Sequence, residues 1–115
     1  MLYLYLSMTD LQMVSTIKQI PLKLFNPYRL LILIDLKLNG ELRFHKLRDD
    51  IGVSDGNLWS HLRALEQEGF VKSKTFLEKR KLKSLITITK EGIQVLEEFN
   101  GQLEILMEFL SKNKI

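Results

Sequence analysis

Hydrophobic residues in the middle of the chain recur every three or four positions, the period of an amphipathic helix. In the run VSDGNLWSHLRALEQEGFV, residues 53–71, they form one face made of Leu58, Leu62 and Leu65. Ser54 stands at the position of an N-cap, and Gly69 follows as a C-terminal stop. The pattern therefore predicts a capped helix over residues 54–68 with one buried face.

The opposite face of this predicted helix is small and polar and carries a single cation. It consists of Gly56, Asn57, Ser60, Arg63, Ala64 and Gln67. Short hydrogen-bonding side chains and one arginine allow a helix to approach base edges in the major groove of DNA. An ordinary surface helix of a small helical domain explains the same face equally well, so the flanking segments have to decide.

A short amphipathic helix is predicted near the start of the chain, over residues 9–20. Thr9 is its cap and Pro21 interrupts it. Its apolar face contains Leu11, Val14, Ile17 and Ile20. Such a helix often packs against a partner chain, but it can equally fold back on its own domain. The first eight residues have neither the basic region nor the cleavage site of a secretory signal.

A second helix is predicted from the Asn-Pro pair at 26–27, a favoured cap and first position, to the Asn-Gly pair at 39–40. Its body is apolar nearly all round, which predicts a helix buried in the centre of the fold. A minimal strand at 42–43 and a short helix over 44–51, closed by Gly52, come next. Two short helices joined by a tight Gly-Val-Ser-Asp connection form a helix-turn-helix arrangement.

A basic β-hairpin is predicted after Gly69, because residues 70–76 and 83–89 contain β-branched and aromatic side chains in partial alternation. Its cations are Lys72, Lys74, Lys79, Arg80, Lys81 and Lys83. Residues 70–90 hold seven Lys or Arg against one Glu, so this segment carries +6 and the rest of the chain −3. We expect these cations to contact phosphates, with a solvated turn as the alternative. No Asn-Gly turn fixes the register of the hairpin.

The last predicted helix begins at Thr89, with Glu91 in its first turn. Its apolar residues step by three and four alternately, as in a coiled-coil seam: Leu96, Phe99, Leu103, Leu106 and Leu110. Between residues 91 and 108 the charged residues are all acidic. A helix that is both apolar and acidic suits a subunit contact held away from a polyanion, and packing within one chain is the alternative.

Composition narrows the function. The 115 residues, 45% hydrophobic and 27% charged, suit one soluble globular domain, and no apolar run approaches the roughly 20 residues of a membrane span. The absence of cysteine fits a cytoplasmic protein. With only His45 and His61 as nitrogen ligands, we expect no metal sensor and no cofactor. There is no Gly-rich phosphate loop and no nucleophile with its base, so we expect no enzyme.

Several single residues invite a chemical interpretation. His61 lies on the flank of the helix over 54–68, where helix packing and phosphate contact explain it equally well. Trp59 is expected to pack against the preceding helix rather than stack on a base. His45 is interpreted as a surface or capping residue. Asp49 and Asp50 are adjacent, but successive helix positions do not face each other, so they form no acid/base pair.

At this point a resemblance can be named. Residues 26–97 resemble the winged-helix DNA-binding domain of MarR/ArsR-like transcriptional regulators. The resemblance lies in the segments 29–33, 52–71, 79–83 and 89–92, with Phe44 and Leu47 between the first two. The run SDGNLWSHLRALEQEGFV is the most specific of these. The resemblance implies a homodimer on a pseudo-palindromic operator, with the helix over 54–68 in the major groove and the wing along the minor groove or backbone.

The resemblance also assigns residues. Positions that usually touch DNA are matched by Ser54, Asn57, Ser60, His61 and Arg63, and the wing tip by Lys79, Arg80 and Lys81. One departure concerns the Asp and Arg pattern that often holds the base of a MarR-type wing, which is only loosely echoed by Glu78 and Arg80.

The expected fold class is α+β, mostly α: a winged helix-turn-helix with a three-helix core, a β-hairpin wing, and N- and C-terminal helices for dimerisation. The expected domains are an N-terminal extension (1–25), a winged-helix DNA-binding domain (26–92) and a dimerisation helix (93–115). The expected partners are double-stranded DNA and a second copy of the chain; the sequence identifies no small-molecule effector. The alternative function is a winged-helix protein-interaction module, which has no need of six cations in its wing.

Overall fold

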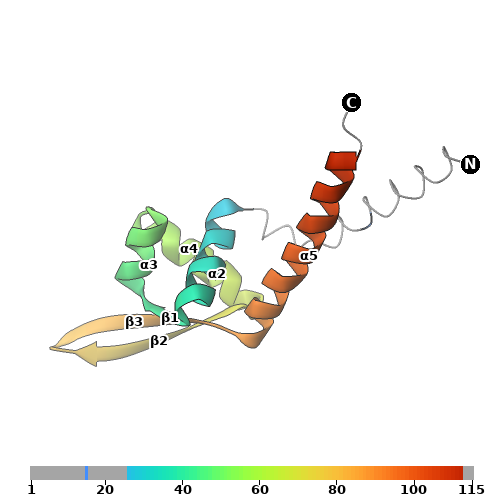
Figure 1. Cartoon of the computed structure of the whole chain (residues 1–115). Helices are drawn as coiled ribbons and strands as arrows, with labels where there is room; N and C mark the ends of the chain where they lie inside the picture. Colours follow the sequence, from blue (N-terminus) through green and yellow to red (C-terminus); the bar gives the residue numbers. More distant parts are fainter. Residues whose placement is uncertain (1–14, 16–25, 113–115) are drawn as a thin grey trace, which may run out of the picture.

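The computed structural model describes Ser15 and residues 26–112 of the chain. Within residues 26–112 the elements are ordered as in Figure 1: α2 (Pro27–Asn39), β1 (Glu41–Arg43), α3 (Phe44–Ile51), α4 (Asp55–Gln67), β2 (Val71–Glu78), β3 (Lys81–Ile88) and α5 (Lys90–Lys112). The helix predicted over residues 9–20, with Leu11, Val14 and Ile17, lies outside the described residues except for Ser15. The predicted α+β, mostly helical winged helix is confirmed.

The hydrophobic core lies where α2, α3 and α4 meet the sheet and the first turns of α5. Its buried residues are Ile32, Leu33, Leu36, Leu47, Leu58, Leu62, Leu65, Val71, Ile86, Ile88, Val95 and Leu96. All three leucines predicted for the buried face of α4 belong to this core. The burial of that face leaves the opposite, polar face of α4 on the outside.

Helix α2 has the predicted ends but not the predicted burial. The Asn26 side chain accepts hydrogen bonds from the backbone N–H groups of Tyr28 (2.9 Å) and Arg29 (3.4 Å), which caps the helix. The prediction that α2 is buried all round is wrong, because Leu31 and Leu38 are 48% and 78% exposed. The core covers only one side of α2. The second apolar side of α2 faces outward, beside α5.

The helix-turn-helix is formed as predicted. Gly52 ends α3 in the left-handed region, with φ of +78°, and donates its N–H to the carbonyl of Arg48 (2.8 Å). Ser54 then caps α4, its Oγ accepting from the backbone N–H of Asn57 at 3.2 Å. The predicted cap and turn residues therefore set the angle between α3 and α4.

The wing is longer than the sequence pattern predicted. Strands β2 and β3 pair from Val71–Ile88 to Glu78–Lys81, and β1 adds to β3, giving a three-stranded antiparallel sheet in the order β1-β3-β2. The turn contains only Lys79 and Arg80, with φ values of +49° and +65°. Two successive positive φ values match a type I′ turn, whose twist suits a two-residue hairpin.

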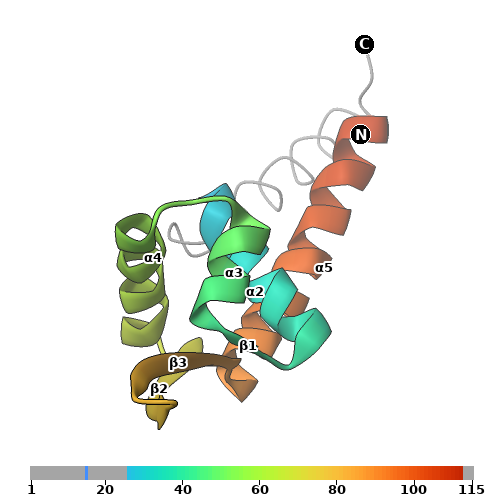
Figure 2. The same ribbon diagram turned by 90° about the vertical axis from the view of Figure 1, so that its left-hand side faces the viewer.

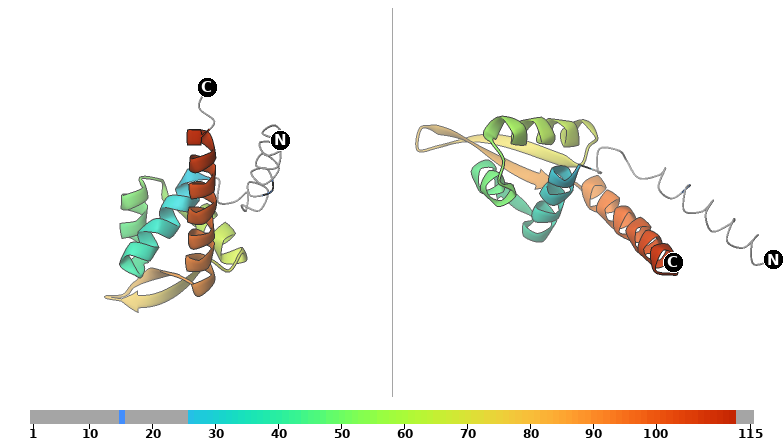
Figure 3. Two further views of the ribbon diagram at one scale, coloured as in Figure 1. Left: turned by 45° about the vertical axis from the view of Figure 1, so that its right-hand side comes forward. Right: turned by 90° about the horizontal axis from the view of Figure 1, so that it is seen from above.

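Helix α5 begins at a compact junction with the end of α4. The Thr89 hydroxyl donates to the carbonyl oxygen of Gly69 (2.5 Å) and accepts from the backbone N–H of Gly92 (3.0 Å), which confirms Thr89 as the cap. From there α5 runs unbroken to Lys112, through the domain boundary predicted at residue 93. The wing and α5 leave the helical core in opposite directions (Figure 3).

Candidate nucleic-acid interface

The polar face of α4 lies at the surface of the molecule. Asn57, Ser60 and Arg63 are exposed, and none of the hydrogen bonds or ion pairs among residues 26–112 engages their side chains. Ser54 is exposed as well, but its Oγ is used as the cap. In Figure 2, α4 stands at the edge of the molecule with the wing strands beneath it. The exposed face of α4 and the wing therefore border the same side of the fold.

His61 occupies the flank of α4 that faces α2. Its Nδ1 accepts a 3.1 Å hydrogen bond from Nε of Arg29, and its ring stacks on Tyr28 with centroids 5.7 Å apart. Burial, and then the charge of Arg29, lower the pKa of His61 below its ordinary value. The sequence left two interpretations of His61 open, helix packing and phosphate contact. The contacts with Arg29 and Tyr28 are those expected for packing of α4 against α2.

Trp59 packs against the start of the preceding helix, as predicted. Its ring stacks on Phe44 with centroids 4.5 Å apart and an interplanar angle of 16°. Both residues are half-buried against the core. The indole therefore helps to hold α4 against α3.

The cations of the wing strands share one face. In the register of β2 and β3, Lys72 lies opposite Thr87, Lys74 opposite Leu85, Phe76 opposite Lys83 and Glu78 opposite Lys81. Alternate residues of a strand point to opposite sides, so the four lysines lie on the side away from the buried Val71, Ile86 and Ile88. Lys79 and Arg80 extend this basic surface around the tip.

The tip end of β2 is tied to β1 by a residue that the sequence analysis missed. Nη1 of Arg43, in β1, lies 2.6 Å from Oε2 of Glu78, and the Arg43 guanidinium lies 5.6 Å from the centroid of the Phe76 ring. Glu78 pairs with Arg43 and Arg80 forms the turn, so the two residues that loosely echo the wing pattern of MarR-type regulators do not pair with each other. Only the pairing of β1 with β3 brings Arg43 near the wing.

The acidic residues of α3 and the first residue of α4 form ion pairs with cations of α3. Asp50 lies 2.7 Å from Lys46, while Arg48 lies 3.0 Å from both Asp49 and Asp55. Asp49 and Asp50 thus bind different cations, consistent with the prediction that they form no acid/base pair.

Asp35, on α2, is the neighbour of Asp50. Burial, and then hydrogen bonding and charge from Asp50, raise the pKa of Asp35, while Lys46 lowers the pKa of Asp50. The side-chain amide of Asn39 donates to Oδ1 of Asp35 at 3.0 Å, whereas Oδ2 is buried without a hydrogen-bond partner. This pair joins α2 to α3 and concerns the stability of the fold.

The part of the chain that the structure describes contains no group of three or more His, Cys, Asp or Glu side chains placed to hold a metal ion. Among these same residues, no helix is both long and apolar enough to cross a membrane.

With this geometry established, comparison with known proteins decides the family. Residues 28–110 match the winged helix DNA-binding domain family. The chain belongs to this family. The predicted resemblance to winged-helix regulators is thereby confirmed, and the known domain covers α2 to most of α5.

This winged-helix protein is similar to known proteins in sequence and in structure. An uncharacterized protein of Methanocaldococcus jannaschii is 40% identical over 70 residues, which cover 61% of this chain and 72% of that protein. The structure of a transcriptional regulator homologue from Pyrococcus horikoshii is 30% identical, with a TM-score of 0.77 over 84% of this chain and 97% of that one. The crystal structure of MarR shares the fold, at 18% identity and a TM-score of 0.66 over 99% and 83% of the two chains.

Proposed function

We propose that this winged-helix protein is a transcriptional regulator that binds specific sequences of double-stranded DNA as a homodimer. Residues 54–68 would lie in the major groove, and the wing tip, residues 78–83, on the minor groove or the backbone. The observation that carries this proposal is the uncovered polar face of α4, with Asn57, Ser60 and Arg63, beside a wing whose cations are free of ion pairs within residues 26–112.

Each part of this surface has a distinct chemical role in the proposal. An arginine pairs in bidentate fashion with the O6 and N7 atoms of guanine, and an asparagine with the N6 and N7 atoms of adenine. Arg63 and Asn57 therefore read bases, while Ser60 is short enough to let the backbone of α4 approach them. Lys79, Arg80 and Lys81 contact phosphates, which strengthens binding to any sequence. Lys72, Lys74 and Lys83 supply further positive charge along the wing.

The homodimer would form through residues 93–115, which include most of α5, and the N-terminal segment, residues 1–25. Within α5, Leu103 and Leu110 are 39% and 60% exposed, and Phe99 and Leu106 are half-buried. The remaining residue of the predicted seam, Leu96, is only 7% exposed and packs in the hydrophobic core of the same chain. A partner helix on this seam would cover side chains that otherwise face water.

An apolar groove beside the seam supports the same assignment. It has a volume of about 530 Å³ and lies between α2 and α5, lined by Leu30, Ile34, Lys37, Leu38, Leu96, Phe99, Asn100 and Leu103. The exposed side of α2, which the sequence predicted to be buried, forms one wall of this groove. A dimer contact over α5 would therefore continue onto α2.

Selection of bound sequences from random duplex DNA tests the proposal directly. We expect enrichment of a pseudo-palindrome with two half-sites and an affinity that falls steeply as the salt concentration rises. Salt-dependent binding without an enriched sequence would contradict base reading by α4. No binding to duplex DNA at low ionic strength would contradict the whole proposal and favour a protein-interaction module.

A further inference from the structure

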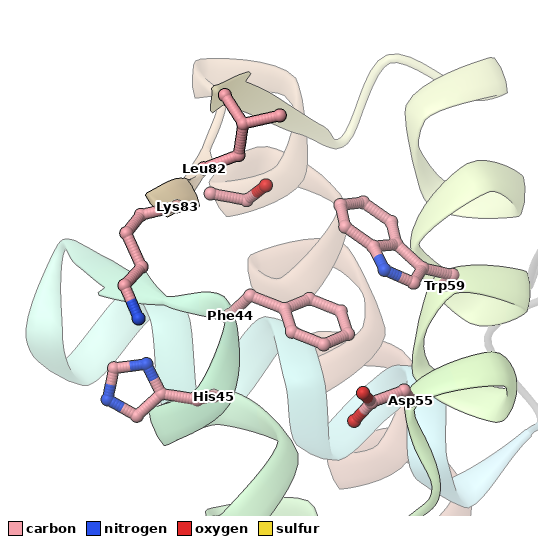
Figure 4. A pocket seen from close by; sticks show the side chains of 7 residues that line it. Phe44, His45, Asp55, Trp59, Leu82 and Lys83 are labelled. Atoms are coloured by element: carbon pink, nitrogen blue, oxygen red, sulfur yellow. The ribbon is translucent and has the colours of Figure 1, made fainter. Parts of the chain in front are cut away.

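A second cleft, distinct from the groove between α2 and α5, opens between the wing and the helix-turn-helix. It has a volume of about 280 Å³ and lies where β3 passes the starts of α3 and α4. Figure 4 shows Phe44 and Trp59 on one side of it and Lys83 reaching from β3 toward His45. Ser84 and Leu82 complete the β3 wall. Residues of α3, α4 and β3 thus line one cleft.

The basic residues of this cleft, Lys83 and His45, differ from their neighbours in having no acidic partner within residues 26–112. Arg43, Lys46 and Arg48 are each bound to a carboxylate, at 2.6 to 3.0 Å. In contrast, no ion pair or hydrogen bond among residues 26–112 engages the side chains of His45 and Lys83.

The single carboxylate that lines the cleft, Asp55, is held by Nη1 of Arg48 at 3.0 Å, and this neighbouring cation offsets its charge. The side chains free to bind a ligand together are therefore those of Lys83 and His45, because Ser84, the next residue of β3, points to the other side of the strand. Such a set suits an oxyanion.

We infer that this cleft binds one phosphate of the DNA backbone, held by Lys83 and His45 together. The inference rests on the proposed DNA-binding function and adds to it a defined contact between α4 and the wing. A cleft of about 280 Å³ is several times the roughly 30 Å³ that one water molecule occupies in the liquid, so a phosphate group and ordered water fit within it. His45, interpreted from the sequence as a surface or capping residue, becomes a DNA contact.

The position of the cleft explains why a backbone phosphate is its ligand. A duplex that receives α4 in its major groove presents phosphates along both edges of that groove, and the cleft lies between α4 and the wing. Lys83 pairs with Phe76 across the hairpin, whereas the tip is formed by Lys79 and Arg80. Lys83 and the wing tip would therefore contact different phosphates.

A double-mutant cycle with duplex DNA of arbitrary sequence tests this inference. Lys83→Gln should lower the salt dependence of binding by about one phosphate equivalent, and Lys83→Gln and His45→Ala should each weaken binding by about tenfold. Because both side chains bind one phosphate, the double variant should lose less than the product of the two single losses. The matched control Lys46→Gln removes a lysine whose charge is already paired with Asp50, at 2.7 Å, and should leave DNA affinity unchanged.

A second cycle separates the cleft from the wing tip. The losses from His45→Ala and Lys81→Gln should multiply, because these residues contact separate phosphates. Thermal unfolding of every variant is measured in parallel, and unchanged midpoints exclude a purely structural effect. Independent losses for His45 and Lys83, or no loss, would overturn the inference while leaving the proposed function in place. A wild-type protein that binds no duplex DNA would instead remove the proposed function.

Fluorescence provides a readout inside the cleft, because Trp59 is the only tryptophan of the chain. Duplex DNA should change its emission in the wild type, and this change should diminish in the His45→Ala, Lys83→Gln double variant at saturating DNA. Inorganic phosphate at matched ionic strength should leave the emission unchanged. A response to inorganic phosphate but not to DNA would identify a free-anion site and overturn the assignment to the DNA backbone.

Discussion

The hydroxyl of Thr89 donates a 2.5 Å hydrogen bond to the carbonyl oxygen of Gly69, although the two residues are separated by the whole wing. The same hydroxyl accepts from the backbone N–H of Gly92 and caps α5. A third bond runs from the backbone N–H of Thr89 to the carbonyl of Phe70, at 3.0 Å. The end of α4, the end of the wing and the start of α5 are thus joined at one buried threonine.

Replacing Thr89 by Val should lower the free energy of unfolding by about 1 to 2 kcal/mol, because both the helix cap and the bond to Gly69 are lost. Urea denaturation measures this loss. Thr89→Ser keeps the hydroxyl and should restore most of the stability. An equal loss for valine and serine would mean that the methyl group, not the hydrogen bonds, matters at this position.

Gly92 and Gly101 should respond in opposite ways to alanine. A Cβ on Gly92 would come too close to the carbonyl oxygen of Phe70 and would press on Ile88, whereas a Cβ on Gly101 meets nothing within 4 Å. Gly92→Ala should therefore destabilise the protein, and Gly101→Ala should stabilise it by up to about 1 kcal/mol through helix propensity. Denaturant unfolding of both variants checks this, and a neutral Gly92→Ala would contradict the tight packing at the start of α5.

Arg63→Ala and Lys81→Ala should affect DNA binding differently. Loss of Arg63 should cost about 1 to 3 kcal/mol on the preferred sequence and relax base preference, because a bidentate base contact disappears. Loss of Lys81 should weaken binding to all sequences alike and reduce the salt slope by about one. Affinities for preferred and scrambled duplexes over a range of salt concentrations separate the two effects. If both substitutions act the same way, α4 does not read bases.

Leu103→Glu should convert the proposed dimer into monomers and weaken operator binding. The side chain is 39% exposed on α5, so a carboxylate there remains solvated in a monomer but would be buried in the proposed dimer. Sedimentation at several protein concentrations measures the change. Leu77→Glu, at a 69% exposed position of the wing, is a matched control that should remain dimeric. A monomeric wild type would exclude two-half-site binding through α5.

Asp35→Asn should raise the free energy of unfolding at neutral pH and have little effect in acid. The folded-state pKa of Asp35 is raised by burial and by Asp50, so its protonated form favours the fold. That contribution is lost as the pH rises through the folded-state pKa, and a neutral asparagine retains it. Urea unfolding at several pH values tests the sign. The control Asp49→Asn removes a carboxylate bound to Arg48 and should give no such gain.

The helix-turn-helix was predictable because its signals are local. Ser54, Gly52 and the leucines of α4 are all within one short stretch, and each specifies a cap, a turn or a buried face. The burial of α2 was not predictable in the same way. An apolar side that packs in a core and one that faces a groove have the same composition, so the sequence could not distinguish them.

Contacts between distant segments account for the rest of what the sequence missed. Arg43 reaches Glu78, and Asp35 meets Asp50, only after the sheet and the helices have assembled. The turn at Lys79 and Arg80 also lacks local signals, since neither residue favours a positive φ. Long pairing of β2 with β3, anchored by Val71 and Ile88 in the core, imposes that conformation.

Helix α5 is a single unbroken helix, which suits it to act as a rigid arm in the proposed dimer. Its 23 residues extend about 34 Å at the usual helical rise of about 1.5 Å per residue, which is close to the roughly 34 Å between half-sites one turn apart on DNA. Since α4 is fixed to the start of α5 through Thr89, any change in the angle at which two α5 helices cross in the proposed dimer would alter the gap between its two α4 helices. The distance between half-sites that the dimer accepts would then be set by the crossing of the α5 helices, far from the bases, and not by α4 itself.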